Sequence, residues 1–223
     1  MEGEGTVTEK LYYQDPGKLE FDAALVRSAA LRDGRCEVVV DRTAFYPGGG
    51  GQPADRGTLG GAPVVEVREE DNGDIVHVLQ RAVSGPRLSG AVDAARRRDF
   101  MAQHTGEHIL AQALLQAGKL HTVSVHFGDE DTTIEVKADS IDDRVLQAAE
   151  DIANGVIREN RRLVVHEVDR SEAGRFPLRN AASILSGPFT VPFHASIRSE
   201  VAFSHASAAS KSSPTRAKDL MVR

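Results

Sequence analysis

The apolar residues change their spacing at Asp93, and this change is the strongest constraint on the fold. Before Asp93 they form short runs separated by turn residues, whereas after it they recur with the period of an α-helix. The sequence therefore predicts an α+β protein in two parts. The first is a small β-barrel-like domain over residues 1–92, with strands expected at residues 6–12, 19–26, 36–41, 62–69 and 74–79.

One hairpin is predicted inside this β domain. Residues 64–68 and 75–79 flank the sequence Asp71-Asn72-Gly73-Asp74. Asn, Asp and Gly tolerate left-handed backbone geometry, which tight turns between paired strands require. We therefore expect these two strands to pair.

The second part, residues 93–179, begins with a predicted helix. Asp93 can cap a helix over residues 94–117, and Gly118 can end it. The apolar side of this helix consists of Phe100, Met101, Leu110, Ala111, Leu114 and Leu115.

A hairpin of residues 121–127 and 132–137 is predicted after this helix. Ser140 and Asp143 then resemble a capping box for a second helix that ends near residue 160. Residues 163–168 are expected to form a strand. The order helix, hairpin, helix, strand predicts a two-layer α+β domain.

Residues 180–223 have a different composition. In the last 43 residues only Glu200 and Asp219 are acidic, although the chain contains 33 acidic residues, and no helical or strand period persists. Such segments are more often mobile than folded. We expect an aberrant, disordered tail.

Composition narrows the functional classes. The net charge is −6, and Cys36 is the single cysteine, which excludes an internal disulfide framework and suits a reducing compartment. A net negative charge does not favour non-specific binding along DNA. No run of 18 apolar residues is present, and the first ten residues contain no apolar signal segment. We expect a cytoplasmic protein with neither a membrane nor DNA as partner.

The sharpest motif is the segment from Gln103 to His108. His104 and His108 are four residues apart, so on a helix they lie about 40° apart and can face one ion. Neutral imidazoles suit zinc, although such a pair alone is more often packed or solvated. Gly106 between them costs about 1 kcal/mol relative to Ala, which is easier to explain if another group approaches the backbone closely.

The same residues match His-x-x-Glu-His, a zinc protease pattern in which Glu107 would be the general base. Such an enzyme needs a third ligand. Glu135, Glu150 and Glu159 stand downstream without any distinguishing context. A zinc metalloprotease is therefore the first alternative function.

A glycine-rich segment, from Thr43 to Pro53, is the second motif. Its four glycines, residues 48–51, are followed by Gln52. A mobile linker is one interpretation, and a phosphate-binding loop is disfavoured because no Gly-Lys-Ser/Thr follows. In the third interpretation the backbone amides and the Gln52 amide approach a substrate.

Both motifs together resemble a known family. The segments Asp41-Arg-Thr-Ala-Phe-Tyr-Pro-Gly-Gly-Gly-Gly-Gln-Pro-Ala-Asp-Arg-Gly57 and Arg97-Arg-Asp-Phe-Met-Ala-Gln-His-Thr-Gly-Glu-His-Ile-Leu110 are similar to the free-standing alanyl-tRNA editing proteins of the AlaX type, relatives of the editing domain of alanyl-tRNA synthetase. The resemblance extends from about residue 9 to residue 178. It implies the second-additional-domain fold of threonyl- and alanyl-tRNA synthetases.

The resemblance also implies an activity, namely trans-editing of tRNA(Ala) that is mischarged with serine or with glycine. An aminoacyl ester is already activated, so the site need only orient a water and the ester, and a pocket that hydrogen-bonds the seryl hydroxyl rejects alanine. The implied residues are His104 and His108 as Zn²⁺ ligands, Gln52 and Thr105 as catalytic residues, and Gly49, Gly50, Gly51, Thr122 and Ser124 as substrate contacts.

The sequence departs from this family after Arg179. The resemblance implies a Cys-x-x-x-His element there as the other half of the zinc site, and the element is missing. Cys36 lies upstream, in a predicted strand where a buried apolar role is expected, and His194 and His205 lie in the tail without a supporting pattern. A shifted reading frame or an error in the assigned gene explains both the loss and the tail. A non-catalytic tRNA-binding remnant is therefore the second alternative function.

Arginines flank both predicted helices. Arg158, Arg161 and Arg162 close the second helix, where they suit the helix dipole. Arginines at the start of the first helix are expected to neutralise acceptor-stem phosphates if they line the mouth of the pocket. The predicted tRNA contacts are therefore Arg96, Arg97 and Arg98, in a protein that is a monomer or a weak dimer.

Overall fold

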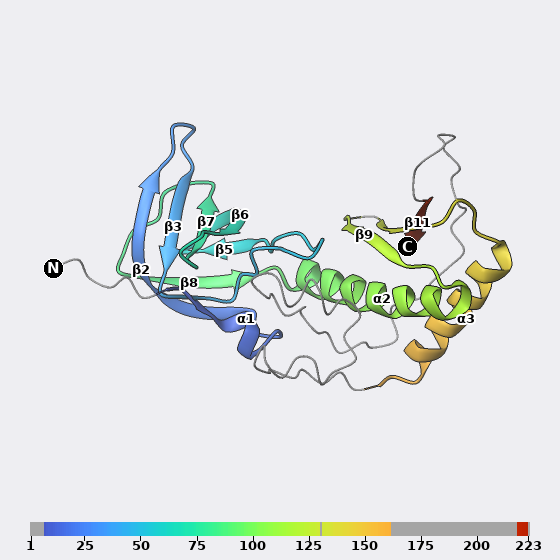
Figure 1. Ribbon diagram of the computed structural model, residues 1–223. Helices are drawn as coiled ribbons and strands as arrows, with labels where there is room; N and C mark the ends of the chain where they lie inside the picture. The colour runs from blue at the N-terminus through green and yellow to red at the C-terminus, as the bar shows by residue number, and fades with distance from the viewer. Residues whose placement is uncertain (1–6, 130, 162–217, 223) are drawn as a thin grey trace.

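The computed structural model describes residues 7–129, 131–161 and 218–222 (Figure 1). A β-barrel stands at one end of the long helix α2 (Ala94–Gly118), a second helix crosses the other end, and a small sheet lies along α2 between them (Figure 1). The predicted α+β class is confirmed. The helix begins directly after the last strand of the barrel, so it joins the two parts.

Six antiparallel strands close the barrel in the order β2-β3-β7-β6-β5-β8. The predicted β6–β7 hairpin is confirmed, with Glu69 opposite Ile75. The sequence does not predict β5 and β8, because glycines interrupt their strand pattern. The strands are β2 (Glu20–Ala30), β3 (Cys36–Val40), β5 (Gly57–Leu59), β6 (Ala62–Glu69), β7 (Ile75–Leu79) and β8 (Arg87–Val92).

The strand predicted at residues 6–12 is only partly present. β1 (Glu9–Lys10) pairs in parallel with β4 (Arg42–Thr43), and the single helical turn α1 (Leu11–Gln14) follows β1 at once. Leu11 and Tyr12 are both buried in this turn. A strand would have placed these two neighbours on opposite faces, so the helical turn buries apolar surface that a strand would have exposed.

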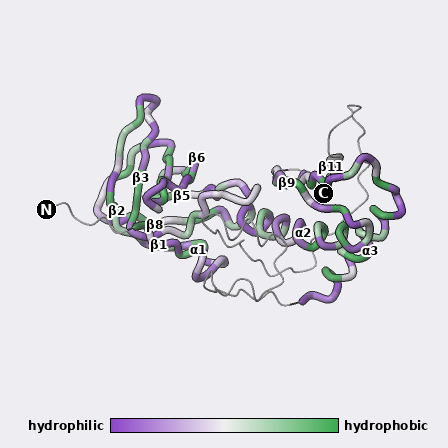
Figure 2. Tube along the Cα trace, viewed as in Figure 1, coloured by the Kyte–Doolittle hydropathy of each residue, from purple (hydrophilic) through white to green (hydrophobic). Residues whose placement is uncertain are grey.

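His77 lies buried in the barrel interior. Its strand β7 otherwise consists of hydrophobic residues, and such residues are green along the tube in Figure 2. Nδ1 of His77 donates to the carbonyl of Val38 (3.2 Å), and its Nε2 accepts from the hydroxyl of Thr43 (2.8 Å). Burial lowers the pKa of His77 to about 4. The ring is therefore neutral and is satisfied at both nitrogens.

The predicted cap of α2 is confirmed, whereas its predicted end is not. The Asp93 side chain accepts from the backbone amides of Ala95 (3.0 Å) and Arg96 (3.1 Å). At the other end Lys119, with φ of 55°, takes the left-handed conformation, and Gly118 is still helical. A Cβ at Gly118 would lie 2.4 Å from Val145 Cγ1. The glycine therefore allows close packing of α3 instead of serving as the cap.

The second part combines the sheet β9 (Thr122–Phe127), β10 (Thr132–Val136) and β11 (Lys218–Val222) with helix α3 (Asp143–Arg158). The predicted hairpin is confirmed as β9 and β10. Asp142, not Ser140, caps α3 by accepting from the Arg144 amide (2.8 Å), because it immediately precedes the helix. The shared core consists of Leu110, Ala113, Leu114, Leu120, Ile134, Val136, Leu146, Ala149, Ala153 and Ile157.

Part of the predicted disordered tail is ordered. Lys218–Val222 forms β11, which pairs antiparallel with β10, because a strand edge offers unpaired backbone groups to any extended segment. The strand predicted at residues 163–168 and the rest of the tail lie outside the described residues. None of the described helices has the length and apolar character needed to cross a bilayer.

Candidate active site

The glycine-rich loop between β4 and β5 has a defined hairpin shape, which excludes the interpretation as an unstructured linker. Gly48, Gly49, Gly50 and Gly51 have φ values of 89°, 136°, 60° and 88°, a region that other residues rarely adopt. The backbone groups of Gly49 and Gln52 exchange two hydrogen bonds of 3.0 Å. Gly50 and Gly51 are therefore the central residues of a tight turn whose left-handed geometry requires glycine.

The loop reaches from the barrel towards β9 (Figure 1). A Cβ added to Gly51 would lie 2.9 Å from the carbonyl oxygen of Val125 and 3.3 Å from the ring of Phe127. Any side chain at Gly51 would therefore collide with β9. The loop tip is seated against this strand as closely as backbone atoms allow.

Gln52, at the loop tip, contacts His104 of α2. Its Oε1 accepts from Nδ1 of His104 at 2.8 Å, and both residues are buried. The Nε2 atom of Gln52 is also buried and has no hydrogen-bond partner in the described part of the chain. The structure thus joins the two sequence motifs and leaves one buried amide donor at their junction.

His104 and His108 stand next to each other on α2. Their ring centres are 5.0 Å apart, and their planes are tilted by 39°. Two imidazoles that share a tetrahedral zinc have ring centres about 5 Å apart, because each Zn–N bond is about 2.0 Å long. The spacing of the pair therefore fits a shared ion.

Both rings have an oxygen acceptor beside Nδ1. For His104 this acceptor is Gln52 Oε1, and for His108 it is Oε2 of Glu107, at 3.0 Å. Metal-binding histidines usually donate one ring N–H to a carbonyl or carboxylate, which leaves the lone pair on the other nitrogen. The contact with Gln52 gives His104 the tautomer in which Nε2 can bind a metal, and the Glu107 carboxylate favours the same tautomer in His108.

The histidine pair supplies only half of a tetrahedral zinc site. In residues 7–129, 131–161 and 218–222, no group of three or more His, Cys, Asp or Glu side chains could hold a metal. Cys36 is buried in the barrel core, as predicted. His194 and His205 lie outside the described residues.

The position of Glu107 disfavours the protease interpretation. A general base must face the water that it activates. Glu107 is buried, and its Oε2 faces the ring of His108. The carboxylate is therefore placed to orient a histidine.

The hydroxyl of Thr105 points back into the helix. It donates to the carbonyl of Met101 at 2.9 Å, an ordinary i−4 bond of helical threonine. The hydroxyl proton of Thr105 is therefore used within the helix, so towards a substrate Thr105 could only accept a hydrogen bond.

The described hydrogen bonds bring neither Thr122 nor Ser124 to the loop, and their role as substrate contacts stays a prediction. Ser124 donates to Glu135 on the face of β9 opposite to Val125. A register shift pairs Thr122 with Val136, at the end of β9 remote from Phe127, about 16 Å away along the strand. Strand alternation directs the Ser124 hydroxyl away from Gly51, whereas the bulge leaves Thr122 on the face of Val136 with its Oγ1 buried, far from Gly51 along the strand.

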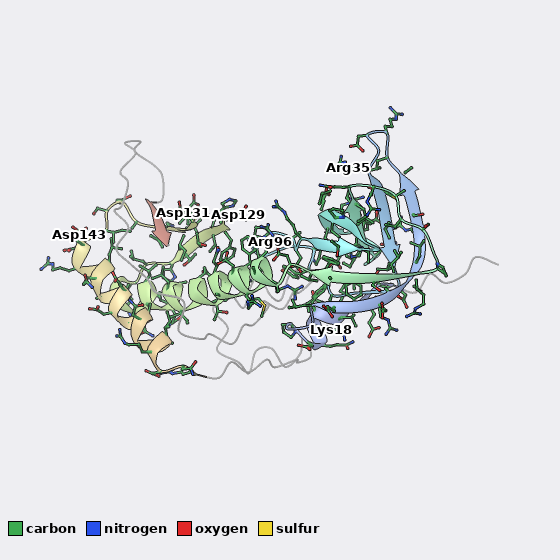
Figure 3. The ribbon with its side chains drawn as sticks, turned by 180° about the vertical axis from the view of Figure 1, so that it is seen from behind. Lys18, Arg35, Arg96, Asp129, Asp131 and Asp143 are labelled. Atoms are coloured by element: carbon green, nitrogen blue, oxygen red, sulfur yellow. The ribbon has the colours of Figure 1, made fainter. Side chains whose placement is uncertain are left out.

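The three neighbouring arginines have different environments. Arg97 has 1% of its side chain exposed and pairs with Asp55, so the prediction that it binds phosphate is wrong: α2 turns it into the protein. Arg96 lies over the Phe100 ring and donates to Asp129 at 2.6 Å. Figure 3 labels Arg96 and Asp129, which lie near each other. Arg98 is exposed. Only Arg98, and in part Arg96, can meet an external phosphate.

An aromatic cluster lies beside the loop, and the sequence analysis missed it. Tyr12 and Tyr46 are buried edge to face, and Met101 of α2 packs against them. The Tyr46 hydroxyl donates to the Gly49 carbonyl (3.3 Å), and burial raises the pKa of Tyr46 to about 12. Only the tyrosine within the glycine-rich motif gave a sequence signal for this cluster.

The fold and the site thus combine a closed barrel, a helix with a histidine pair and a glycine-rich loop that contacts the first histidine, the two motifs that resemble alanyl-tRNA editing proteins. No family model matches the chain. It is 35% identical over 171 residues to the alanyl-tRNA editing protein AlaX-L of Pyrococcus horikoshii, a match that covers 74% of this chain and 42% of that protein.

Alanine–tRNA ligases match the same share of the chain. The ligase of Halobacterium salinarum is 34% identical and that of Ignicoccus hospitalis 37% identical, each over 177 residues, with 74% of this chain and 19% of the ligase covered. The predicted resemblance is confirmed: the chain belongs with the AlaX-type editing proteins and a segment of alanine–tRNA ligases. It spans less than half the length of these relatives.

Proposed function

We propose that this chain is an aminoacyl-tRNA deacylase that removes serine, or glycine, from mischarged tRNA(Ala) in trans. The relatives named for alanyl-tRNA editing support the reaction class. The observation that carries the proposal is the 2.8 Å contact between Gln52 and His104. This contact places a glycine-lined loop, a buried amide and a histidine pair at one point.

The residues at this point suit ester hydrolysis. An aminoacyl ester needs no protein nucleophile, because a positioned water can attack it. The turn formed by Gly50 and Gly51 allows close approach of a substrate to the backbone, and the buried Nε2 of Gln52 is a donor that a bound polar group would satisfy. An unpaired buried donor costs about 1–3 kcal/mol, so the site favours a ligand with an acceptor there.

Zinc fits the two histidines as ligands. His104 and His108 would hold it through Nε2, while Gln52 and Glu107 keep the proton on each Nδ1. When bound, the ion supplies an electrophile that polarises or positions the ester. Two protein ligands hold zinc more weakly than four, so we propose that activity depends on added zinc.

Contacts to the tRNA are assigned to the exposed rim of the site. Arg98 is exposed at the start of α2, and Arg96 is partly exposed beside it. Both can attract phosphates without reading bases. We propose the cytoplasm as the compartment, since mischarged tRNA arises there.

A deacylation assay separates this function from the two alternatives. The purified chain is incubated with Ser-tRNA(Ala), Gly-tRNA(Ala), Ala-tRNA(Ala) and casein, with chelator and with zinc restored. Editing predicts zinc-dependent release of serine or glycine, with alanine retained, and loss of release in His104→Ala. Peptide release that is lost in Glu107→Gln would instead show a protease, and tRNA binding without turnover would show a remnant. Gln112→Ala, an exposed change elsewhere on α2, is the matched control.

A further inference from the structure

Arg97 and Asp55 form a buried ion pair at the base of the glycine-rich loop, with 1% and 3% of their side chains exposed. Nε of Arg97 donates to Oδ1 of Asp55 at 3.0 Å, and Nη2 donates to Oδ2. The same guanidinium donates to the carbonyls of Ala44 (2.6 Å) and Pro16 (2.8 Å). The start of α2 is thus bonded to the segment before β2 and to both ends of the connection between β4 and β5.

Asp55 also closes the neck of the loop, which is the point where its two ends, Tyr46 and Asp55, meet. Its Oδ2 accepts from the backbone amide of Tyr46 at 2.6 Å, and its own amide donates to the carbonyl of Tyr46 at 3.0 Å. The segment between Tyr46 and Asp55 is therefore a closed unit. Arg97 holds this unit by its neck.

The neck and the tip of the loop meet the same stripe of α2. Arg97 and His104 are seven residues apart, which places them about 20° apart around the helix and about 10 Å apart along it. Arg97 binds Asp55 at the neck, and His104 donates a hydrogen bond to the side-chain oxygen of Gln52 at the tip. Because the loop is a closed unit, the position of its neck determines where its tip lies.

A buried ion pair is a weak source of stability but an effective means of fixing one register. We propose that Arg97 and Asp55 are positioning residues for the site: they fix the point on α2 at which the loop docks, and so set the Gln52 amide against His104. The consequence for turnover rests on the proposed function. The docking itself does not.

Hydrogen exchange tests the docking without any activity measurement. Arg97→Lys keeps the charge but loses the forked contact, and Asp55→Asn is the second variant. Leu79→Ala, which creates a cavity in the barrel core on β7 without touching the Arg97–Asp55 pair, controls for lost global stability. We expect the amides of Gly49 and Gln52 to exchange at least tenfold faster relative to the amides of β2 in Arg97→Lys, and to keep the wild-type ratio in Leu79→Ala, because Leu79 lies on β7 and β2 does not pair with that strand. An unchanged ratio in Arg97→Lys would overturn the proposal.

The second arm measures serine release by Arg97→Lys alone and combined with Gln52→Ala. Positioning through Gln52 predicts that Arg97→Lys lowers kcat at least tenfold in the wild type and has almost no effect once Gln52 is Ala. Additive losses would contradict positioning through this residue. If the wild type releases no amino acid, the proposed function fails, whereas the exchange ratio still decides whether the pair docks the loop.

Discussion

The side-chain oxygen of Gln52 accepts a hydrogen bond of 2.8 Å from Nδ1 of His104, although 52 residues separate the two along the chain. One partner belongs to a loop of the barrel, and the other belongs to the helix that leaves it. This bond sets the tautomer of His104, because a ring that donates from Nδ1 carries its lone pair on Nε2. The contact with the loop therefore places the His104 lone pair on Nε2, the nitrogen that would bind a metal ion.

Replacing Gln52 should weaken metal binding. We expect Gln52→Ala to lower zinc affinity and deacylation by about 10–100-fold, the usual effect of losing an orienting partner of a histidine ligand. Gln52→Glu retains an acceptor and should lose less zinc affinity. Competition with a chromophoric chelator measures the affinity, with Gln112→Ala as control. Equal affinity in wild type and Gln52→Ala would show that the contact does not orient the ligand.

A methyl group at the loop tip should displace the loop. Gly51→Ala places a Cβ 2.9 Å from the Val125 carbonyl, at a φ of 88°. Gly61→Ala has a similar φ of 73° with nothing within 4 Å, so it carries the backbone strain of about 1 kcal/mol without the collision. We expect both to lower the free energy of unfolding, measured in urea, and only Gly51→Ala to abolish deacylation. Loss of activity in both variants would mean that the collision is irrelevant.

Strong local signals made much of the fold predictable. The hairpin of β6 and β7 has a turn of Asp, Asn and Gly between apolar runs, and Asp93 stands directly before a helical period. Turn chemistry and capping act within a few residues, so the sequence alone reveals them. The histidine pair and the glycine run were recognisable for the same reason.

Features that depend on tertiary packing were not predictable. Arg97 resembles its exposed neighbour Arg98 in sequence, and only the position of Asp55 decides that one is buried and the other is not. Ser124 faces away from the loop because of strand alternation, and a register shift places Thr122 opposite Val136 at the far end of β9. Such facts follow from contacts between distant segments, which no local pattern records.

Two helical glycines should respond to alanine with opposite signs. A Cβ at Gly118 would lie 2.4 Å from Val145 Cγ1, whereas a Cβ at Gly155 would meet nothing within 4 Å. Gly155→Ala should raise the free energy of unfolding by about 0.5–1 kcal/mol, because glycine disfavours the helix. Gly118→Ala should lower it by about 1–3 kcal/mol, because α3 must shift. Urea titrations of both variants measure these differences, and stabilisation by Gly118→Ala would show that α2 and α3 are not packed closely there.

The barrel should lose stability in mild acid through His77. Its pKa is lowered to about 4 in the folded chain against 6.5 in the unfolded chain, so between these values the unfolded state binds the additional proton. The free energy of unfolding therefore falls as the pH falls from 6.5 to 4, by about 3 kcal/mol in total. His77→Gln removes this contribution, so its unfolding free energy should depend less on pH. Identical slopes in urea titrations of both proteins would refute this account.

Salt dependence of tRNA binding should distinguish the exposed arginine from its buried neighbour. Each phosphate contact that is lost lowers the slope of log K against log salt by about one. Arg98→Ala should therefore weaken binding of deacylated tRNA(Ala) and reduce the slope by about one, because Arg98 is exposed near the start of α2 and is the proposed tRNA contact. Arg144→Ala, an exposed arginine at the start of α3, should leave the slope unchanged. Filter binding at several salt concentrations measures both, and an equal effect of the two variants would place the tRNA elsewhere.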